Sequence, residues 1–549
     1  MSMAFHINIS GTTVLTLDGP VSGRDVLLRS GNMSSRNIVA WRVNNYLRSL
    51  DWIIDEDSSV EFVDTSSFEG MEVYRRSLSF LLVMASRKAL AEEIVIRHSI
   101  SDGYYWELEN RALTAQDVQS VKSCLDEMVG KDIPIKRELL PLDKATRLFR
   151  NMGSCECANL FQWSNVDPVE VYRCVDEYGF FYAPLAPSTG YLKVYDLKLL
   201  DPGMVLQFPT VNYPDKVPPF HPSRKLSEVF LEYAHWLETL GLNTMDSLHL
   251  RISEGKALEL VLVSEALHSQ RLSRLAEDIS SRENLRLISI AGPSGSGKTT
   301  TAQRLKIQLQ VCGKKPLTIS LDDFFLDRKD TPLDENGGYD FDTLEALDLD
   351  LLNSTLEKLF KGQAVTLPVF DFFEGKKRPG PTLQLKDENI LIIEGIHGLN
   401  QRLSSSVPED MKFKLFVSPL TGISFDRHNR TSTTDNRLFR RLVRDYRKRG
   451  HSVSATLEQW PSVIRGSMKY VFPFQDQADA MFNSSLPYEL GVLKGYVEPI
   501  LHTVPQHSPV YGEALRLLSM LRYIPIIPSE NVPKNSILRE FIGGSSFEA

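Results

Sequence analysis

The sequence has few cysteines, no excess of positive charge and no long apolar run. Five cysteines in 549 residues do not make a disulfide framework. Lys and Arg number 62 against 70 Asp and Glu, which argues against a generally basic nucleic-acid-binding or membrane-surface protein. The longest apolar run, residues 80–85, is far shorter than the roughly 18 residues that a membrane-spanning helix needs. The first ten residues show no secretory signal, so we expect a cytoplasmic protein without a membrane partner.

Apolar patterning divides the first half of the chain into two predicted units and a linker. Residues 1–66 show short alternating strands and a brief helix, which indicates a small β-rich domain. Residues 70–247 mix strands and helices, including a helix predicted over 74–96. Residues 248–284 end in an amphipathic stretch, which we expect to form a linker helix.

The second half of the chain has the alternation of strands and helices that is typical of a parallel α/β sheet. Apolar strand cores stand at 285–291, 317–321, 390–393 and 413–417. We expect one domain over 285–490, followed by a helical tail over 491–549.

A glycine-rich motif follows the first of these strands. GPSGSGKT at 292–299 satisfies G-x-x-x-x-G-K-[ST] in full. Its glycines let backbone N–H groups face a triphosphate, Lys298 reaches the β- and γ-phosphates, and the Thr299 hydroxyl binds Mg²⁺. A glycine turn without a nucleotide is the alternative, and the strand and helix that flank the loop argue against it. The predicted ATP-binding residues of this segment are Gly292, Pro293, Ser294, Gly295, Ser296, Gly297, Lys298, Thr299 and Thr300.

Acidic residues stand at two further strand ends. Asp322 and Asp323 close the strand core 317–321, and Glu394 ends a later one. Ligands of open α/β sheets bind beyond the carboxyl ends of the strands, where a carboxylate can take a proton from a hydroxyl or hold a metal. We predict Asp322 as the catalytic base, because it ends its strand, and Glu394 as the acid that organises Mg²⁺ together with Thr299. A capping role is the alternative for the aspartate pair.

Eight arginines lie between residues 426 and 450, with one lysine and three aspartates. The three- and four-residue spacing of Arg437, Arg440, Arg441 and Arg444 puts cations on one face of a predicted helix. The planar guanidinium suits bidentate recognition of phosphate, so we expect this helix to close over ATP as a lid. A solvated helix face and an RNA-binding stripe are the alternatives.

With these motifs in this order, the region 285–490 resembles the uridine kinase and phosphoribulokinase family of P-loop kinases. The matching segments are GPSGSGKT (292–299), LDDFF (321–325), DFDTLEALD (340–348), PVFDF (368–372), IIEGIHGLN (392–400) and DNRLFRRLVRDYRKRG (435–450). The resemblance implies catalytic roles for Lys298, Asp322 and Glu394, and ATP binding by Arg437 and Arg441. It also implies a substrate pocket formed by Asp342, Phe370, Arg378, Arg444 and Arg449.

Two departures from the family pattern fall on the acceptor side. Nucleoside-binding members carry a His shortly after a Tyr-Asp-Phe motif, whereas residues 373–378, which follow Phe372 here, contain none. The second Arg that usually follows the Arg-Gly of the lid is His451 here. ATP and phosphoryl transfer are therefore better supported than uridine.

The N-terminal half resembles the appended regions of threonyl-tRNA synthetase, with residues 1–66 like its TGS domain and 70–247 like its second additional, editing domain. The matching segment is 97–118. That editing domain uses two His on one helix and a Cys–His pair farther on. Ala85 and Ala89 stand at the His positions here, and residues 181–191 contain neither Cys nor His, so we expect no deacylation at this site.

Together these features predict an α/β P-loop kinase domain with a parallel sheet and flanking helices, preceded by a small β-grasp TGS-like domain and an α+β editing-like domain. The leading hypothesis is an ATP- and Mg²⁺-dependent kinase for the hydroxyl of a small molecule, first a nucleoside such as uridine or cytidine. A kinase for a sugar, polyol or sugar phosphate is one alternative, and a regulatory or RNA-associated ATP-binding module is another. Contact of the N-terminal half with RNA and a homo-oligomer both stay open.

Overall fold

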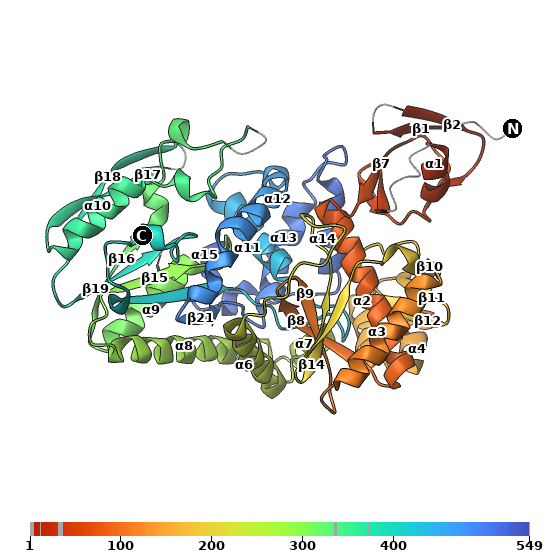
Figure 1. Cartoon of the computed structure of the whole chain (residues 1–549), viewed down its shortest axis with the longest axis horizontal. Coiled ribbons are helices and arrows are strands. Elements are labelled where there is room, and N and C mark those ends of the chain that lie inside the picture. Colours follow the sequence, from red (N-terminus) through yellow and green to blue (C-terminus); the bar gives the residue numbers. More distant parts are fainter. Residues whose placement is uncertain (1–4, 11–12, 31–36, 334–336, 372–373, 548–549) are drawn as a thin grey trace.

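The structure, a computed structural model, describes residues 5–10, 13–30, 37–333, 337–371 and 374–547. Figure 1 shows the parallel sheet of the second half at one end of the molecule and the first, mixed sheet at the other, with helices between them. The domain boundaries given above stay predictions. No helix among the described residues is long and apolar enough to cross a membrane.

The first sheet has five strands in the order β2-β1-β7-β4-β5, with β1 and β7 parallel and the other pairs antiparallel. Its elements are β1 (Phe5–Ile9), β2 (Thr13–Leu17), β4 (Ile38–Val43), β5 (Tyr46–Arg48) and β7 (Ser58–Asp64), beside α1 (Gly23–Arg29) and the short pair β3 (Val21–Ser22) and β6 (Ile53–Ile54). Phe5, Ile7 and Ile9 are buried while the residues between them are exposed, as the alternating pattern predicts for a sheet with one covered face. The unit is the expected small β-grasp domain.

Two antiparallel sheets and four helices follow. The elements are α2 (Phe68–Leu90), β8 (Ile94–Ile100), β9 (Gly103–Leu108), α3 (Ala115–Gly130), β10 (Ile135–Leu140), α4 (Leu142–Asn151), α5 (Cys155–Ser164), β11 (Val169–Cys174), β12 (Glu177–Phe180), β13 (Asp196–Leu200) and β14 (Gly203–Gln207). The strands pair in the orders β13-β14-β9-β8 and β10-β11-β12. The helix predicted over 74–96 was wrong at its end, because Ala91 takes a left-handed conformation (φ 54°) and residues 94–100 pair with β9.

Three helices, α6 (Arg224–Leu240), α7 (Met245–Ser253) and α8 (Ala257–Ser281), connect this part to the second half. In Figure 1, α8 runs along the bottom of the parallel sheet. Leu272, Leu275 and Ile279 are buried on one stripe of α8, which confirms the predicted amphipathic helix. The helix is bound to its neighbour α9 by a buried ion pair, Arg304 to Glu265 at 3.2 Å.

The second half is built on a five-stranded parallel sheet in the order β16-β19-β15-β20-β21. Its strands are β15 (Leu287–Ala291), β16 (Lys315–Ser320), β19 (Asn389–Glu394), β20 (Lys412–Ser418) and β21 (Ala480–Asn483). The other elements are α9 (Lys298–Val311), α10 (Leu349–Phe360), the hairpin β17 (Ala364–Asp371) and β18 (Lys376–Gln384), α11 (Thr433–Lys448), α12 (Val453–Tyr470), α13 (Glu489–Leu501), α14 (Tyr511–Leu521) and α15 (Arg539–Ile542). All four predicted strand cores are confirmed, and β15 and β19 are buried along their whole length, as strands of a covered parallel sheet should be.

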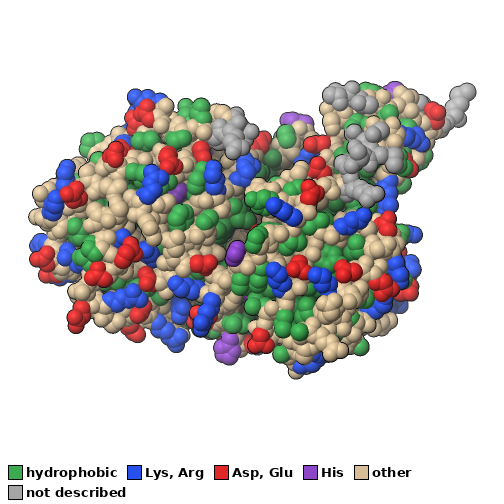
Figure 2. Space-filling view, viewed as in Figure 1, with side chains coloured by type: hydrophobic (Ala, Val, Ile, Leu, Met, Phe, Trp, Pro, Cys, Tyr) green, Lys and Arg blue, Asp and Glu red, His purple; other side chains and the backbone are tan. Residues whose placement is uncertain are grey.

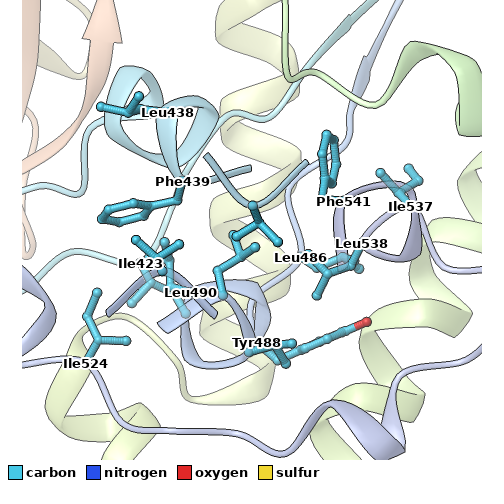
Figure 3. Packing of buried hydrophobic residues seen from close by; sticks show 14 of the residues in the cluster. Ile423, Leu438, Phe439, Leu486, Tyr488, Leu490, Ile524, Ile537, Leu538 and Phe541 are labelled. Carbon is cyan, nitrogen blue, oxygen red and sulfur yellow. The ribbon is translucent and has the colours of Figure 1, made fainter. Parts of the chain in front are cut away.

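The tail predicted over 491–549 is part of the core. Its residues Ile537, Leu538 and Phe541 are fully buried and belong to the cluster that also contains residues of β15 and α11. Figure 3 shows them packed with Leu486 and Leu490. The segment 532–543 therefore packs against the domain that contains the parallel sheet.

Candidate active site

The phosphate loop begins where β15 ends and leads directly into α9. Gly295 and Gly297 both have φ of +80°, a conformation that side chains rarely adopt. A Cβ on Gly292 would lie 2.0 Å from the carbonyl oxygen of Val417, so the loop can approach β20 only without a side chain there. The sequence motif thus folds as a tight turn that leaves the first N–H groups of α9 facing outward.

The two predicted metal ligands lie in contact. The Thr299 hydroxyl donates to Glu394 Oε1 at 3.2 Å, and the Ser320 hydroxyl donates to the same oxygen at 2.9 Å. Mg²⁺ prefers oxygen donors and in kinases is usually held by one or two protein groups together with substrate phosphates. The described residues contain no group of three or more His, Cys, Asp or Glu placed to hold a metal. The pair therefore fits a Mg²⁺ ion that is bound jointly by the protein and a nucleotide.

Burial changes the proton affinity of the groups around this pair. Burial first, and the nearby Asp322 carboxylate second, raise the pKa of Glu394 to about 7, against the opposite effect of Lys298. Burial also lowers the pKa of Lys298, which the carboxylates of Glu394 and Asp322 partly offset. The site thus places one ammonium close to two carboxylates.

The two adjacent aspartates have different surroundings. The strand β16 ends at Ser320, and Asp322 lies in the 3₁₀ turn Leu321–Phe324, so the prediction that Asp322 ends the strand was wrong by two residues. Asp323 accepts a hydrogen bond from the backbone N–H of Phe370 at 3.2 Å, which ties β17 to this turn. The Asp322 carboxylate instead interacts electrostatically with Lys298 and Arg449. Asp322 faces the phosphate loop and Asp323 supports the fold.

Helix α11 brings its arginines to the loop from inside the core. Arg437 is 2% exposed and donates from Nε to the Ser294 carbonyl oxygen at 2.9 Å, and Arg441 donates to the Ser294 hydroxyl at 3.1 Å. Leu438, Phe439, Leu442 and Val443 of the same helix are at most 1% exposed. The helix is therefore a core element that fixes its arginines, and it differs from the separately closing lid that the sequence suggested.

Arg440 has a structural role. Its guanidinium is completely buried and donates to the Glu489 carboxylate at 2.9 Å and to the Ser484 carbonyl oxygen at 2.8 Å. It also donates to the Gly295 carbonyl oxygen at 3.3 Å, so it holds the back of the loop against α13.

A single buried carboxylate, Asp445, gathers three of the predicted phosphate- or substrate-binding arginines. Its oxygens lie 3.1 Å from Arg441, 2.9 Å from Arg444 and 3.7 Å from Arg449. Burial alone would raise the pKa of Asp445, but the three guanidiniums hold it below its ordinary value. Burial in turn lowers the pKa of Arg449 to about 10. The cluster carries a net positive charge next to the loop.

Of the predicted acceptor residues, Asp342 and Phe370 are partly or fully buried, whereas Arg378 is exposed. Asp342 lies against Gly466 of α12, and burial raises its pKa to about 6 despite the nearby Arg441 and Arg437. Phe370 is buried on β17 with its ring 5.8 Å from that of Phe325.

Arg378 lies on the exposed hairpin strand β18. Its guanidinium is paired with Asp371 at 2.9 Å and with Glu374 at 2.8 Å. Its charge is thus compensated within its own hairpin. Phe372, the last residue of the predicted PVFDF segment, lies outside the described residues.

Several residues of the site were missed from the sequence. Ser320 precedes the acidic turn directly, and Asp445 stands inside the arginine run, so spacing could have indicated both. Glu540 gave no such signal, although its carboxylate accepts a hydrogen bond from the Thr300 N–H at 3.1 Å. Thr300 and Glu540 are 240 positions apart in the sequence, so no local pattern relates them.

The place of the editing site in the N-terminal half is filled. Ala85 is fully buried and belongs to the apolar cluster that also contains Phe80, Val83 and Phe181. The rings of Phe80 and Phe181 meet edge to face with centroids 5.7 Å apart. An apolar packing thus occupies the region where the resemblance would put imidazoles.

The N-terminal half also contacts the second half through Arg427. The guanidinium lies 3.2 Å from Glu109 and 3.6 Å from Glu93, while the Arg427 carbonyl oxygen accepts from the Ile96 N–H at 2.9 Å. A cavity of about 390 Å³ lies beside these groups. On the face shown in Figure 2 acidic and basic side chains are interspersed over both halves among the described residues.

Comparison with known proteins gives two sets of relatives. The model described as "Phosphoribulokinase / Uridine kinase family" matches residues 287–489. A uridine kinase of Chloroflexus aurantiacus is 30% identical over 223 residues, 40% of this chain and 97% of that enzyme. A uridine kinase of Halalkalibacterium halodurans is 32% identical over 197 residues, 36% of this chain and 84% of that enzyme.

The second set consists of threonine–tRNA ligases, which match the N-terminal half. That of Azoarcus sp. is 29% identical over 199 residues, 36% of this chain. The chain spans only 28% to 31% of the length of such ligases. Among solved structures, the one titled "Structure of a Possible Uridine Kinase from Bacillus stearothermophilus" has a TM-score of 0.27 and 19% identity, and covers 39% of this chain and 97% of that one.

Proposed function

Because this chain belongs to the phosphoribulokinase/uridine kinase family, we propose that it transfers the γ-phosphate of ATP to the hydroxyl of a small molecule in the presence of Mg²⁺. The observation that carries the proposal is the contact of Thr299 with Glu394, next to Lys298 and Asp322 at the carboxyl edge of the sheet. A binding module would need the loop and the metal ligands, but it would have no use for a base.

Each charged group of the site has a defined task in this reaction. The backbone N–H groups of 295–300 and the Lys298 ammonium hold the phosphates. Thr299 and Glu394 would hold Mg²⁺, which would supply positive charge to offset that of the phosphates. Asp322 accepts the proton of the acceptor hydroxyl. The oxygen of that hydroxyl attacks the γ-phosphorus, and ADP leaves.

The arginines hold the loop and provide fixed positive charge. Arg437 and Arg441 hold Ser294, and the guanidiniums gathered by Asp445 lie where they can stabilise charge on the transferring group. Because these side chains are fixed in the folded chain, little reorganisation is required at the moment of transfer.

We propose a nucleoside such as uridine or cytidine as the acceptor, which the two uridine kinase relatives support. Asp342, whose pKa burial raises to about 6, is then the carboxylate that binds an acceptor hydroxyl, with Phe370 as a further residue of the pocket. A sugar, polyol or sugar phosphate is the second candidate, and the absence of a His in the sequence of residues 373–378 favours it.

The experiment that tests the activity uses purified chain with ATP, Mg²⁺ and a panel of uridine, cytidine, adenosine, ribose, ribulose 5-phosphate and inositol. ADP release and product mass are measured. Lys298→Ala is the blank and Lys306→Ala, on the same helix, is its control. Undiminished turnover by Lys298→Ala would refute the mechanism, and acceptor-independent ADP release alone would favour a regulatory ATP-binding module.

The base is tested with its neighbour as the control. Asp322→Asn is expected to bind ATP normally and to lose transfer by about 100-fold or more, since general-base catalysis contributes roughly that factor. Asp323→Asn is expected to lower stability through its contact with β17 and to retain most of the transfer rate. Equal loss of ATP binding and transfer in Asp322→Asn would remove it from this role.

For the N-terminal half we propose a binding or regulatory role without deacylation, supported by the apolar packing around Ala85. RNA contact would appear as binding that weakens steeply with salt. Binding of tRNA by the full chain that is insensitive to salt, or none at all, would exclude an RNA phosphate contact.

A further inference from the structure

One of the N–H groups that a nucleotide would use is already bonded to a carboxylate of this chain. Glu540 Oε2 accepts from the Thr300 N–H at 3.1 Å. Thr300 is the third residue of α9, and N–H groups at this position have no acceptor within the helix. Together with the helix dipole they form an anion site, and here the anion is a side chain.

The segment around Glu540 is packed firmly beside the loop. Ile537 lies so close to Gly297 that a Cβ there would meet its methyl carbon at 2.5 Å. The Tyr488 and Ser536 hydroxyls are 3.3 Å apart, and the Phe541 ring stacks on the Arg440 guanidinium at 5.1 Å. Figure 3 shows Ile537, Leu538 and Phe541 within the buried cluster.

Arg539 holds the segment by hydrogen bonds to backbone groups before and after it in the chain. Its guanidinium donates to the backbone carbonyl oxygens of Ser529 at 2.9 Å, Val532 at 2.7 Å and Gly543 at 3.3 Å. Glu540 itself is only half-buried. The backbone of α15 is thus held in place, whereas the Glu540 side chain is partly exposed to solvent.

The charge of Glu540 acts on the groups that bind phosphate. It interacts electrostatically with both Lys298 and Glu394. A phosphate at the loop needs the same N–H and the same ammonium, and a carboxylate next to it would repel it. Glu540 and a nucleotide phosphate therefore cannot both use Thr300.

We propose that Glu540 is an intramolecular competitor for the phosphate loop, so that nucleotide binds only after this side chain has turned away from Thr300. The inference rests on the proposed nucleotide binding, but it concerns an autoinhibitory contact made by the segment 536–542. That segment stays docked, because its apolar residues remain buried whether or not the carboxylate turns.

The test compares Glu540→Gln with Glu530→Gln in the full chain. Glutamine has the same shape without the charge, and Glu530 is an exposed residue of the 3₁₀ turn Ser529–Asn531, which precedes the segment. Binding of ATP with Mg²⁺, and of tripolyphosphate alone, is measured by titration calorimetry without any acceptor. We expect both ligands to bind about tenfold more tightly to Glu540→Gln, as befits removal of one charge-assisted hydrogen bond, and equally to Glu530→Gln and wild type.

Unchanged or weaker binding by Glu540→Gln would overturn the inference, and weaker binding would make Glu540 a ligand of the nucleotide instead. Absence of ATP binding in both wild type and Glu540→Gln would overturn it too. If Glu540→Gln fails to fold, Glu540→Ala and Glu540→Asp give the same comparison, with Asp expected between wild type and Ala. Tighter binding without any acceptor turnover would leave the inference standing and count against the kinase proposal alone.

Discussion

Asp445 offers a sharp test of the electrostatics of the site. Its side chain is completely buried and faces the guanidiniums of Arg441, Arg444 and Arg449 within 3.7 Å. Asp445→Asn keeps the shape and one acceptor oxygen but removes the negative charge that is paired with all three arginines. A nucleotide phosphate could then supply the missing negative charge.

Two opposing effects decide the outcome. Removing one partner of a buried ion pair costs about 3–5 kcal/mol of stability, and the retained amide oxygen puts Asp445→Asn near the lower end. Loss of order in the arginines would weaken phosphate binding by about 0.5–1.5 kcal/mol for each side chain that must be fixed again. The attraction between one unpaired guanidinium and a phosphate charge about 4 Å away is worth about 4 kcal/mol at an effective dielectric constant of about 20. This attraction exceeds the cost of fixing one or two arginine side chains again, so we expect Asp445→Asn to bind phosphate more tightly than wild type.

The assay is calorimetric titration of tripolyphosphate into the full chain, together with thermal denaturation with and without the ligand. We expect Asp445→Asn to melt at a lower temperature than wild type, to bind tripolyphosphate about tenfold more tightly, and to be stabilised more by it. Transfer to the acceptor should fall, because the arginines are no longer held in place.

The matched control is Asp435→Asn on the same helix. Asp435 is also buried and forms a bidentate pair with Arg516, at 2.7 and 3.0 Å, but Arg516 belongs to α14. It should lose similar stability without any gain in ligand affinity. If Asp445→Asn binds tripolyphosphate no more tightly than Asp435→Asn, the three arginines do not face the phosphate and the reasoning is refuted.

Two further predictions concern the acceptor pocket and the loop. The pKa of Asp342 is about 6 in the folded chain, against an ordinary value of 3.8. Between these pH values the native state keeps a proton that the unfolded state has lost. The free energy of unfolding therefore falls as pH rises through that range. Asp342→Asn should therefore be more stable than wild type by about 3 kcal/mol at pH 8 and close to it near pH 4 in denaturant titrations, and a difference independent of pH would contradict this. Gly292→Ala should unfold at a lower temperature and lose nucleotide binding, because its methyl group would overlap the Val417 carbonyl oxygen; wild-type melting and ATP affinity would show that the loop can relax.

The sequence predicted what depends on local order. The phosphate loop and its flanking strand and helix follow from spacing, and the two predicted metal ligands, Thr299 and Glu394, meet at 3.2 Å. The helix over 74–96 was overextended because helix periodicity cannot register that residues 94–100 pair with another strand.

What could not be predicted depends on packing. An arginine-rich helix looks the same in sequence whether it faces solvent or core, and only the structure shows Arg440 completely buried against Glu489. Arg378 was assigned to the substrate by resemblance, whereas its own hairpin supplies two carboxylates that pair with it. Glu540 reaches Thr300 across 240 residues of sequence, a distance at which no pattern is informative.

That separation has a consequence for the order of events during synthesis. A ribosome makes the loop at 292–299 long before it makes β21 at 480–483 or the segment 536–542. The edge strand and the apolar cover of the loop therefore arrive late, and contacts of such long range are slow to form. In the interval the nascent chain has the phosphate-binding backbone without the carboxylate that opposes it. We expect a newly made chain to be most receptive to nucleotide before its final turns of helix have docked.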